Sequence, residues 1–188
     1  MKTNRFNILI ASTLLVILTM SCKKNNSKVE EPPAVTDSPE LLTSMILQFR
    51  DSANVNNLIT TEFRDPDGPG GKNPTKFDTI QLATNKTYLL KIILLDETKN
   101  PIDTVSKSVW EKRNEHQIFF SQSNVNLVTQ YLDIDGNGLP VGLSSKWKTG
   151  ASITGSSKIT LKHQPNLKNG SITSGETDIE LSFQTHIK

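Results

Sequence analysis

Hydrophobic and polar residues alternate along much of the chain after residue 40. In such a run every second side chain points to the same face, so alternation predicts strands with one buried face. The final run is the clearest, because Ile179, Leu181 and Phe183 share one face while Glu180 and Ser182 take the other. The core-facing positions predicted in the other runs are Thr43, Met45, Leu47 and Phe49; Ile80 and Leu82; Tyr88, Leu90, Ile92 and Leu94; and Ile159, Leu161 and His163.

Residues 89–95 are apolar on both faces except at Lys91. This pattern is typical of a central strand that is covered on both sides. Turn-forming residues separate the runs at residues 65–71, 100–101, 136–138 and 169–170, as expected for strands joined by short connections.

One segment, residues 103–115, has a helical pattern instead. Asp103 is placed to cap a helix, and Val105 and Val109 lie one turn apart. The sequence therefore predicts an all-β domain over residues 40–188, an antiparallel immunoglobulin-like β-sandwich with one short helix near residues 103–115.

The first residues have the layout of a secretory signal. Lys2 and Arg5 precede an uncharged, mostly apolar stretch at residues 8–20, and Ser21 follows it. As a helix this stretch would span roughly 20 Å, whereas the hydrocarbon core of a bilayer is about 30 Å thick. We therefore expect residues 1–21 to be a cleaved signal peptide.

The only cysteine of the chain, Cys22, lies at this junction, so it has no partner for an internal disulfide. Residues 18–22, Leu-Thr-Met-Ser-Cys, resemble the lipobox of bacterial lipoproteins. That resemblance implies that Cys22 becomes the lipidated first residue of the mature chain. Residues 22–39 are polar and proline-containing, which is typical of a flexible tether.

The whole arrangement resembles the small lipoproteins of Bacteroidota, in which a short tether precedes a β-sandwich. The resemblance implies attachment to the outer membrane through the lipid. The lack of an Asp directly after Cys22 resembles lipoproteins that are sorted to an outer membrane, and the acidic runs that resemble surface-export signals in Bacteroidota are missing. A periplasm-facing anchor is therefore favoured over the cell surface.

The charge pattern excludes one class of partner. The formal net charge is +2, and Lys2 and Arg5 of the signal account for all of it. Phosphate binding needs clustered Lys and Arg, so nucleic acid is not an expected partner.

The segment Asp133-Ile134-Asp135-Gly136-Asn137-Gly138 is the most specific candidate site. Oxygen ligands at Asp133, Asp135 and Asn137 resemble the opening of a calcium loop, although the position that should supply a closing Glu is Ser144. The favoured alternative is a tight hairpin turn with solvated aspartates.

Three histidines, His116, His163 and His186, are candidate ligands for zinc or copper, together with a carboxylate such as Glu115. His163 shares the alternating face of Ile159 and Leu161, so the favoured interpretation is a core histidine. A calcium or transition-metal cofactor is therefore an alternative and not an expectation.

Among the aromatic residues, Trp147 is the candidate for contact with a ligand, because Lys146 and Lys148 flank it and Gly150 follows in a polar stretch. The other candidates for a stacking platform are Trp110, Tyr131, Phe119 and Phe120.

No catalytic motif is present, so we do not expect an enzyme. The sequence favours a membrane-anchored, non-catalytic binding or interaction domain, with an envelope protein or a glycan as partner, accessory to an outer-membrane uptake or envelope complex. A metal-binding lipoprotein is the second hypothesis and a small hydrolase the third.

Overall fold

The computed structural model describes residues 40–188, and these residues form a domain of strands with one short helix. The predicted signal, tether and lipidated Cys22 lie outside the described residues. No helix within residues 40–188 is long and apolar enough to span a membrane. In chain order the elements are β1 (Ser44–Asp51), β2 (Leu58–Arg64), β3 (Lys76–Phe77), β4 (Ile80–Leu82), β5 (Thr87–Leu95), α1 (Val105–Glu111), β6 (His116–Ser123), β7 (Leu127–Tyr131), β8 (Ser144–Thr149), β9 (Ile153–His163) and β10 (Glu176–Ile187).

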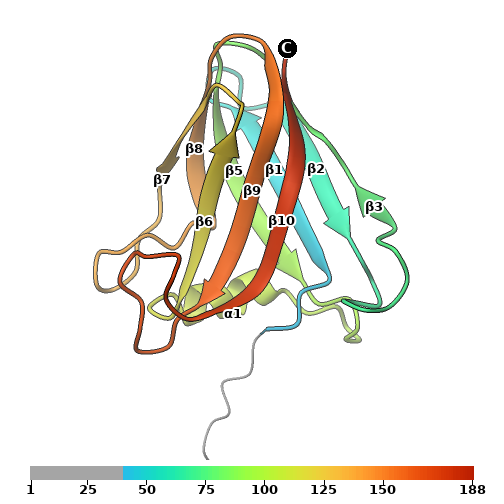
Figure 1. Cartoon of the computed structure of the whole chain (residues 1–188), viewed down its shortest axis with the longest axis vertical. Helices are drawn as coiled ribbons and strands as arrows, with labels where there is room; N and C mark the ends of the chain where they lie inside the picture. Colours follow the sequence, from blue (N-terminus) through green and yellow to red (C-terminus); the bar gives the residue numbers. More distant parts are fainter. Residues whose placement is uncertain (1–39) are drawn as a thin grey trace, which may run out of the picture. The chain divides into compact units, whose positions relative to one another are not determined.

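The strands form two sheets that pack face to face (Figure 1). One sheet has six strands in the order β3-β2-β1-β5-β8-β7, and the other has four in the order β4-β10-β9-β6. All pairs are antiparallel except β4 with β10, which run parallel. The predicted all-β sandwich is therefore confirmed, while its immunoglobulin-like character stays a prediction.

Alternation placed the core residues correctly. In β1, Met45, Leu47 and Phe49 are fully buried, and in β10 Phe183 is fully buried with Leu181 beside it. Side chains of this size stabilise a fold by about 1.5–3 kcal/mol each when they leave water. The inner faces of the two sheets thus supply one continuous core.

The strand over residues 87–95 is central, as predicted, because β5 lies between β1 and β8. Its outer face is less covered than we expected: Leu89 is 40% exposed and Lys91 is also exposed. Residues 89–95 are apolar on both faces, but only the inner face packs fully against the opposite sheet.

Trp147 is not an exposed ligand-binding residue, so that prediction is wrong. Its side chain is fully buried between the sheets, where its ring meets Phe49 at 5.2 Å and Phe120 of the other sheet at 5.6 Å. The indole Nε1 donates a hydrogen bond to Ser145 Oγ (3.0 Å). Successive side chains of a strand point to opposite faces, so Lys146 and Lys148 flank Trp147 in sequence while pointing away from the core.

The predicted helix is present as α1, with Val105 and Val109 buried in the core. Its N-cap is Thr104, with no capping hydrogen bond from the side chain. The predicted cap, Asp103, instead exchanges two backbone hydrogen bonds with Asp96 at the end of β5. This bridge fixes the point where the chain leaves the sheet and brings α1 against β5.

Candidate functional site

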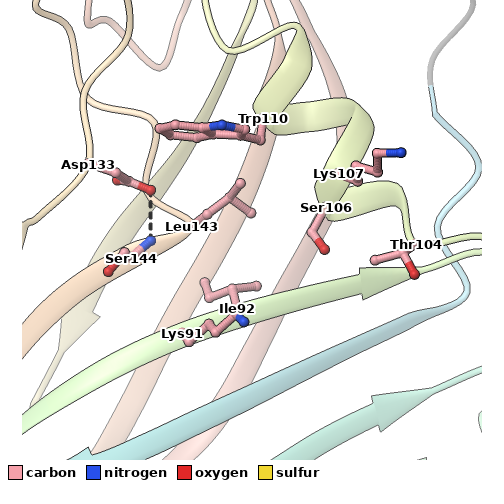
Figure 2. Close-up of a pocket in the computed structure, with 9 residues that line it drawn as sticks. All are labelled: Lys91, Ile92, Thr104, Ser106, Lys107, Trp110, Asp133, Leu143 and Ser144. Carbon is pink, nitrogen blue, oxygen red and sulfur yellow. Dashed lines mark hydrogen bonds between the residues drawn. The ribbon is translucent and has the colours of Figure 1, made fainter.

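A cavity of about 480 Å³ lies where β5 extends beyond its neighbour β8. The β5–β8 ladder ends at the pair Lys91–Ser144, with one further hydrogen bond from Ile92 N to Leu143 O (2.9 Å). Beyond this pair α1 contacts β5, and the cavity is lined by residues of β5, of α1 and of the start of β8. We call it the Trp110 pocket; its lining residues are Lys91, Ile92, Thr104, Ser106, Lys107, Trp110, Asp133, Leu143 and Ser144 (Figure 2).

The walls of the Trp110 pocket are apolar. Figure 2 shows the indole of Trp110 on one side of the pocket, Ile92 on the other side and the side chain of Leu143 between them in the view. Trp110 is 44% exposed, so a large part of its ring surface is open to solvent. An exposed aromatic ring over an apolar wall is a typical surface for holding a small ligand.

Arg113 fixes the orientation of Trp110. The guanidinium carbon lies 5.0 Å from the ring centroid, and Nη1 donates a hydrogen bond to the Trp110 carbonyl oxygen (3.3 Å). Such a cation–π contact contributes about 0.5–1 kcal/mol at an exposed site. Arg113 contacts the Trp110 ring but is not one of the residues that line the pocket.

The rim of the pocket is polar. Lys91 and Lys107 bring positive charge, and Thr104, Ser106 and Ser144 bring hydroxyl groups. These side chains come from β5, from α1 and the residue before it, and from the start of β8.

Asp133 is a fixed part of this rim. Its Oδ1 accepts a hydrogen bond from Gly142 N (2.7 Å) and its Oδ2 accepts one from Ser144 N (2.8 Å). The carboxylate thereby anchors the connection between β7 and β8 to the first residue of β8, and it holds one wall of the pocket in place.

The candidate calcium site at Asp133, Asp135 and Asn137 is not formed. Both carboxylate oxygens of Asp133 accept backbone hydrogen bonds, as described above. Asp135 Oδ1 accepts hydrogen bonds from the backbone N–H groups of Asn137 (2.8 Å) and Leu139 (2.9 Å). The alternative, a turn, is correct: Gly138 N bonds to Asp135 O (3.2 Å). The aspartates are not solvated at its rim, however, because backbone donors and a lysine satisfy them.

That lysine, Lys168, comes from the connection between β9 and β10. Its Nζ lies 2.9 Å from Asp135 Oδ2 and donates a hydrogen bond to Arg113 O (2.7 Å). The side chains of Lys168 and Asp135 are 2% and 0% exposed. Burial alone would raise the pKa of Asp135, but Lys168 and the two backbone donors bring it below its usual value.

Two of the three histidines come together. His116 on β6 and His163 on β9 are direct register partners, and their rings stack at 4.7 Å with an interplanar angle of 17°. Both are buried, and His116 Nδ1 lies 3.2 Å from Lys112 O. His186 lies near the other end of β10, opposite Thr154.

Asp178 lies beside His116, one of the two stacked histidines. The β9–β10 register shifts between Thr177 and Ile179, so Asp178 is the extra residue of a β-bulge. Its Oδ2 lies 3.8 Å from His116 Nε2, and its side chain is 0% exposed. Neither carboxylate oxygen accepts a hydrogen bond from any residue in the described part of the chain.

Burial raises the pKa of Asp178 to about 6. His163 opposes this increase, Glu40 and Glu176 add to it, and Lys162 opposes it. An ionised Asp178 is therefore costly at neutral pH.

The candidate transition-metal site at His116 and His163 is not assembled. Within residues 40–188 no group of three or more His, Cys, Asp or Glu side chains is arranged to hold a metal ion. The histidine stack and Asp178 form a buried polar cluster of the core.

A second cavity, of about 570 Å³, lies beside the start of the described chain and the bulge of β10. Its lining includes Leu41 and Leu42 and four acidic residues, Glu40, Asp65, Asp178 and Glu180. Its one aromatic residue, Phe63, is buried in the core. The exposed aromatic side chain and three hydroxyl groups belong to the lining of the Trp110 pocket, which is therefore our candidate site.

Sequence reasoning names Trp110 only as one of several candidates for a stacking platform, and it misses Lys168 and Asp178. Lys168 carries no local signal. A signal did exist for Asp178, because the alternation of β10 begins only at Ile179 and the residue before it is acidic.

These features define the class: a β-sandwich with an aromatic pocket at one end of the β5–β8 ladder of its larger sheet. The chain matches no family model, no curated protein and no solved structure.

Proposed function

We propose that this protein is an exported, lipid-anchored binding protein of the bacterial envelope, and that its domain binds a small ligand in the Trp110 pocket without catalysis. The half-exposed indole of Trp110 over the apolar residues Ile92 and Leu143 is the observation that supports the binding role most directly. A cavity of about 480 Å³ is within the usual range of ligand pockets, about 300–1,000 Å³.

The chemistry of the rim supports binding over catalysis. The titratable groups that line the pocket are Lys91, Lys107 and Asp133, and Asp133 already accepts two backbone hydrogen bonds. The histidines, which are the usual acid–base groups near pH 7, do not line it: His116 and His163 are buried elsewhere.

Trp110 makes binding directly measurable. The chain has two tryptophans, one half-exposed and one fully buried. We expect an aqueous quencher such as iodide to reduce the emission of Trp110 and to leave that of Trp147 unchanged. A bound ligand should protect Trp110 from the quencher and raise the melting temperature, by an amount equivalent to about 2.7 kcal/mol at one hundred times the dissociation constant.

The test is a titration of the domain with a panel of saccharides and carboxylic acids, read by quenching and by melting temperature. Trp110→Ala should abolish both responses while it changes the melting temperature of the free protein little. Leu132→Ala, which removes an exposed apolar side chain outside the pocket, is the matched control and should keep them. A response that survives in Trp110→Ala would place the binding site elsewhere.

The lipid anchor is tested separately, in the full-length chain expressed in a Gram-negative host. Wild-type protein should incorporate a labelled fatty acid, and Cys22→Ser should not, because the thiol that accepts the lipid is removed. Ser27→Ala is the control and should remain labelled. A wild-type chain that takes up no label would overturn the anchor while leaving the pocket proposal intact.

A further inference from the structure

The Trp110 ring contacts Arg113 and also lines the pocket. The guanidinium carbon lies 5.0 Å from the ring centroid, and Arg113 is not one of the lining residues. The C–H groups of a sugar ring and the face of an aromatic molecule both pack well against an aromatic ring. The ring by itself does not decide between these two ligands.

The rim favours a ligand with several hydroxyl groups. Thr104, Ser106 and Ser144 each carry a hydroxyl that can donate one hydrogen bond and accept others. Asp133 adds an acceptor held in a fixed position: a carboxylate has about four lone-pair sites, and the N–H groups of Gly142 and Ser144 use two of them. A flat aromatic acid would leave most of these groups without a partner, whereas a saccharide would pair with them.

The charges favour an acidic ligand. Lys91 and Lys107 carry two positive charges and Asp133 carries one negative charge, so the lining has one net positive charge. The Asp133 carboxylate faces two backbone N–H donors, which offset part of its charge. Lys107 has one weak partner, the exposed Glu111 at 3.8 Å.

We propose that the Trp110 pocket selects an acidic saccharide, in which a sugar ring lies against the indole, its hydroxyl groups pair with Asp133 and with hydroxyl groups of the rim, and its carboxylate is attracted by the net positive charge that Lys91 and Lys107 give the lining. This assignment rests on the proposed binding function and names its ligand class.

The experiment compares two sugars that differ only in the acidic group, glucuronate and glucose, and adds phenylacetate as an acid with a flat ring and no hydroxyl groups. Binding to the domain is measured by protection of Trp110 from iodide and by calorimetry. We expect glucuronate to bind at least about tenfold more tightly than glucose, because a hydrogen bond to a charged group is stronger than one between neutral groups. Phenylacetate should bind more weakly than glucuronate.

The two lysines are tested by Lys91→Gln and Lys107→Gln. Each variant should lower the affinity for glucuronate severalfold and leave that for glucose unchanged. Lys148→Gln, which neutralises an exposed lysine of the same sheet outside the pocket, is the control and should change neither. Higher salt should weaken glucuronate binding in the wild type more than in the two pocket variants.

The outcomes separate the ligand class from the function. Equal affinity for glucose and glucuronate, or tighter binding of phenylacetate than of either sugar, would overturn the acidic saccharide and retain a binding pocket at Trp110. If neither these three compounds nor any member of the wider panel changes the accessibility of Trp110, the proposed function itself fails.

Discussion

Asp178→Asn is expected to stabilise the domain by about 3 kcal/mol above pH 6 and to change its stability little below pH 4. The carboxylate of Asp178 is fully buried 3.8 Å from His116 Nε2, and no hydrogen bond from residues 40–188 reaches either of its oxygens. Burial raises the pKa of Asp178 to about 6 from its ordinary 3.8. A difference of roughly two pKa units corresponds to about 3 kcal/mol, at 1.36 kcal/mol per unit.

The direction follows from proton binding. Between pH 4 and pH 6 the folded chain holds a proton on Asp178 that the unfolded chain has lost, so wild-type stability falls as the pH rises through this range. Above pH 6 both states are ionised at this residue and the full penalty remains. Asparagine carries no charge at any pH, so the variant avoids this penalty.

Denaturant unfolding of both proteins at several pH values between 4 and 8 measures this difference. Glu111→Gln, an exposed acid on α1, is the control and should shift stability by less than about 0.5 kcal/mol at any pH. Parallel stability profiles for the wild type and Asp178→Asn would show that Asp178 does not titrate in this range.

Lys168→Ala is expected to destabilise the domain by about 3 kcal/mol. Removing one partner of a buried ion pair leaves an uncompensated charge, which typically costs about 3–5 kcal/mol. We expect the lower end because Asp135 would keep the backbone donors of Asn137 and Leu139. The loss of the hydrogen bond from Lys168 to Arg113 O would add to the effect.

Two further variants separate this ion pair from simple packing. Lys158→Ala removes an exposed lysine that pairs with Glu180 at 3.1 Å, and surface pairs contribute about 1 kcal/mol or less. Lys168→Met combined with Asp135→Asn removes both charges and should be more stable than Lys168→Ala. Equal destabilisation by Lys168→Ala and Lys158→Ala in denaturant unfolding would contradict a special role for the buried pair.

The Lys168–Asp135 pair also explains why the candidate calcium site is not formed. The spacing of Asp133, Asp135 and Asn137 resembles that of calcium ligands, and the structure does place a cation beside Asp135. That cation is a lysine ammonium from a segment more than thirty positions further along the chain. A local pattern identifies the acceptors but not the donor that reaches them.

The sequence by itself determined the strands β1, β4, β5, β9 and β10 with their buried faces, and the position of the short helix α1. Alternation is a local property, and it placed residues such as Leu47, Leu90 and Phe183 in the core because strand side chains point to opposite faces in turn. It also predicts the signal and the lipid attachment at Cys22, which stay predictions because they lie outside the described residues.

Only the tertiary structure decided which distant side chains meet. Trp147 has polar neighbours in sequence and is buried, because neighbours along a strand lie on opposite faces. Trp110 is exposed on α1, which contacts β5 near the point where the β5–β8 ladder ends. His116 and His163 stack because strand register brings them together across two strands. The pocket and the buried polar cluster depend on register, on a bulge and on the relative lengths of neighbouring strands, and those are set by packing between segments that are far apart in the chain.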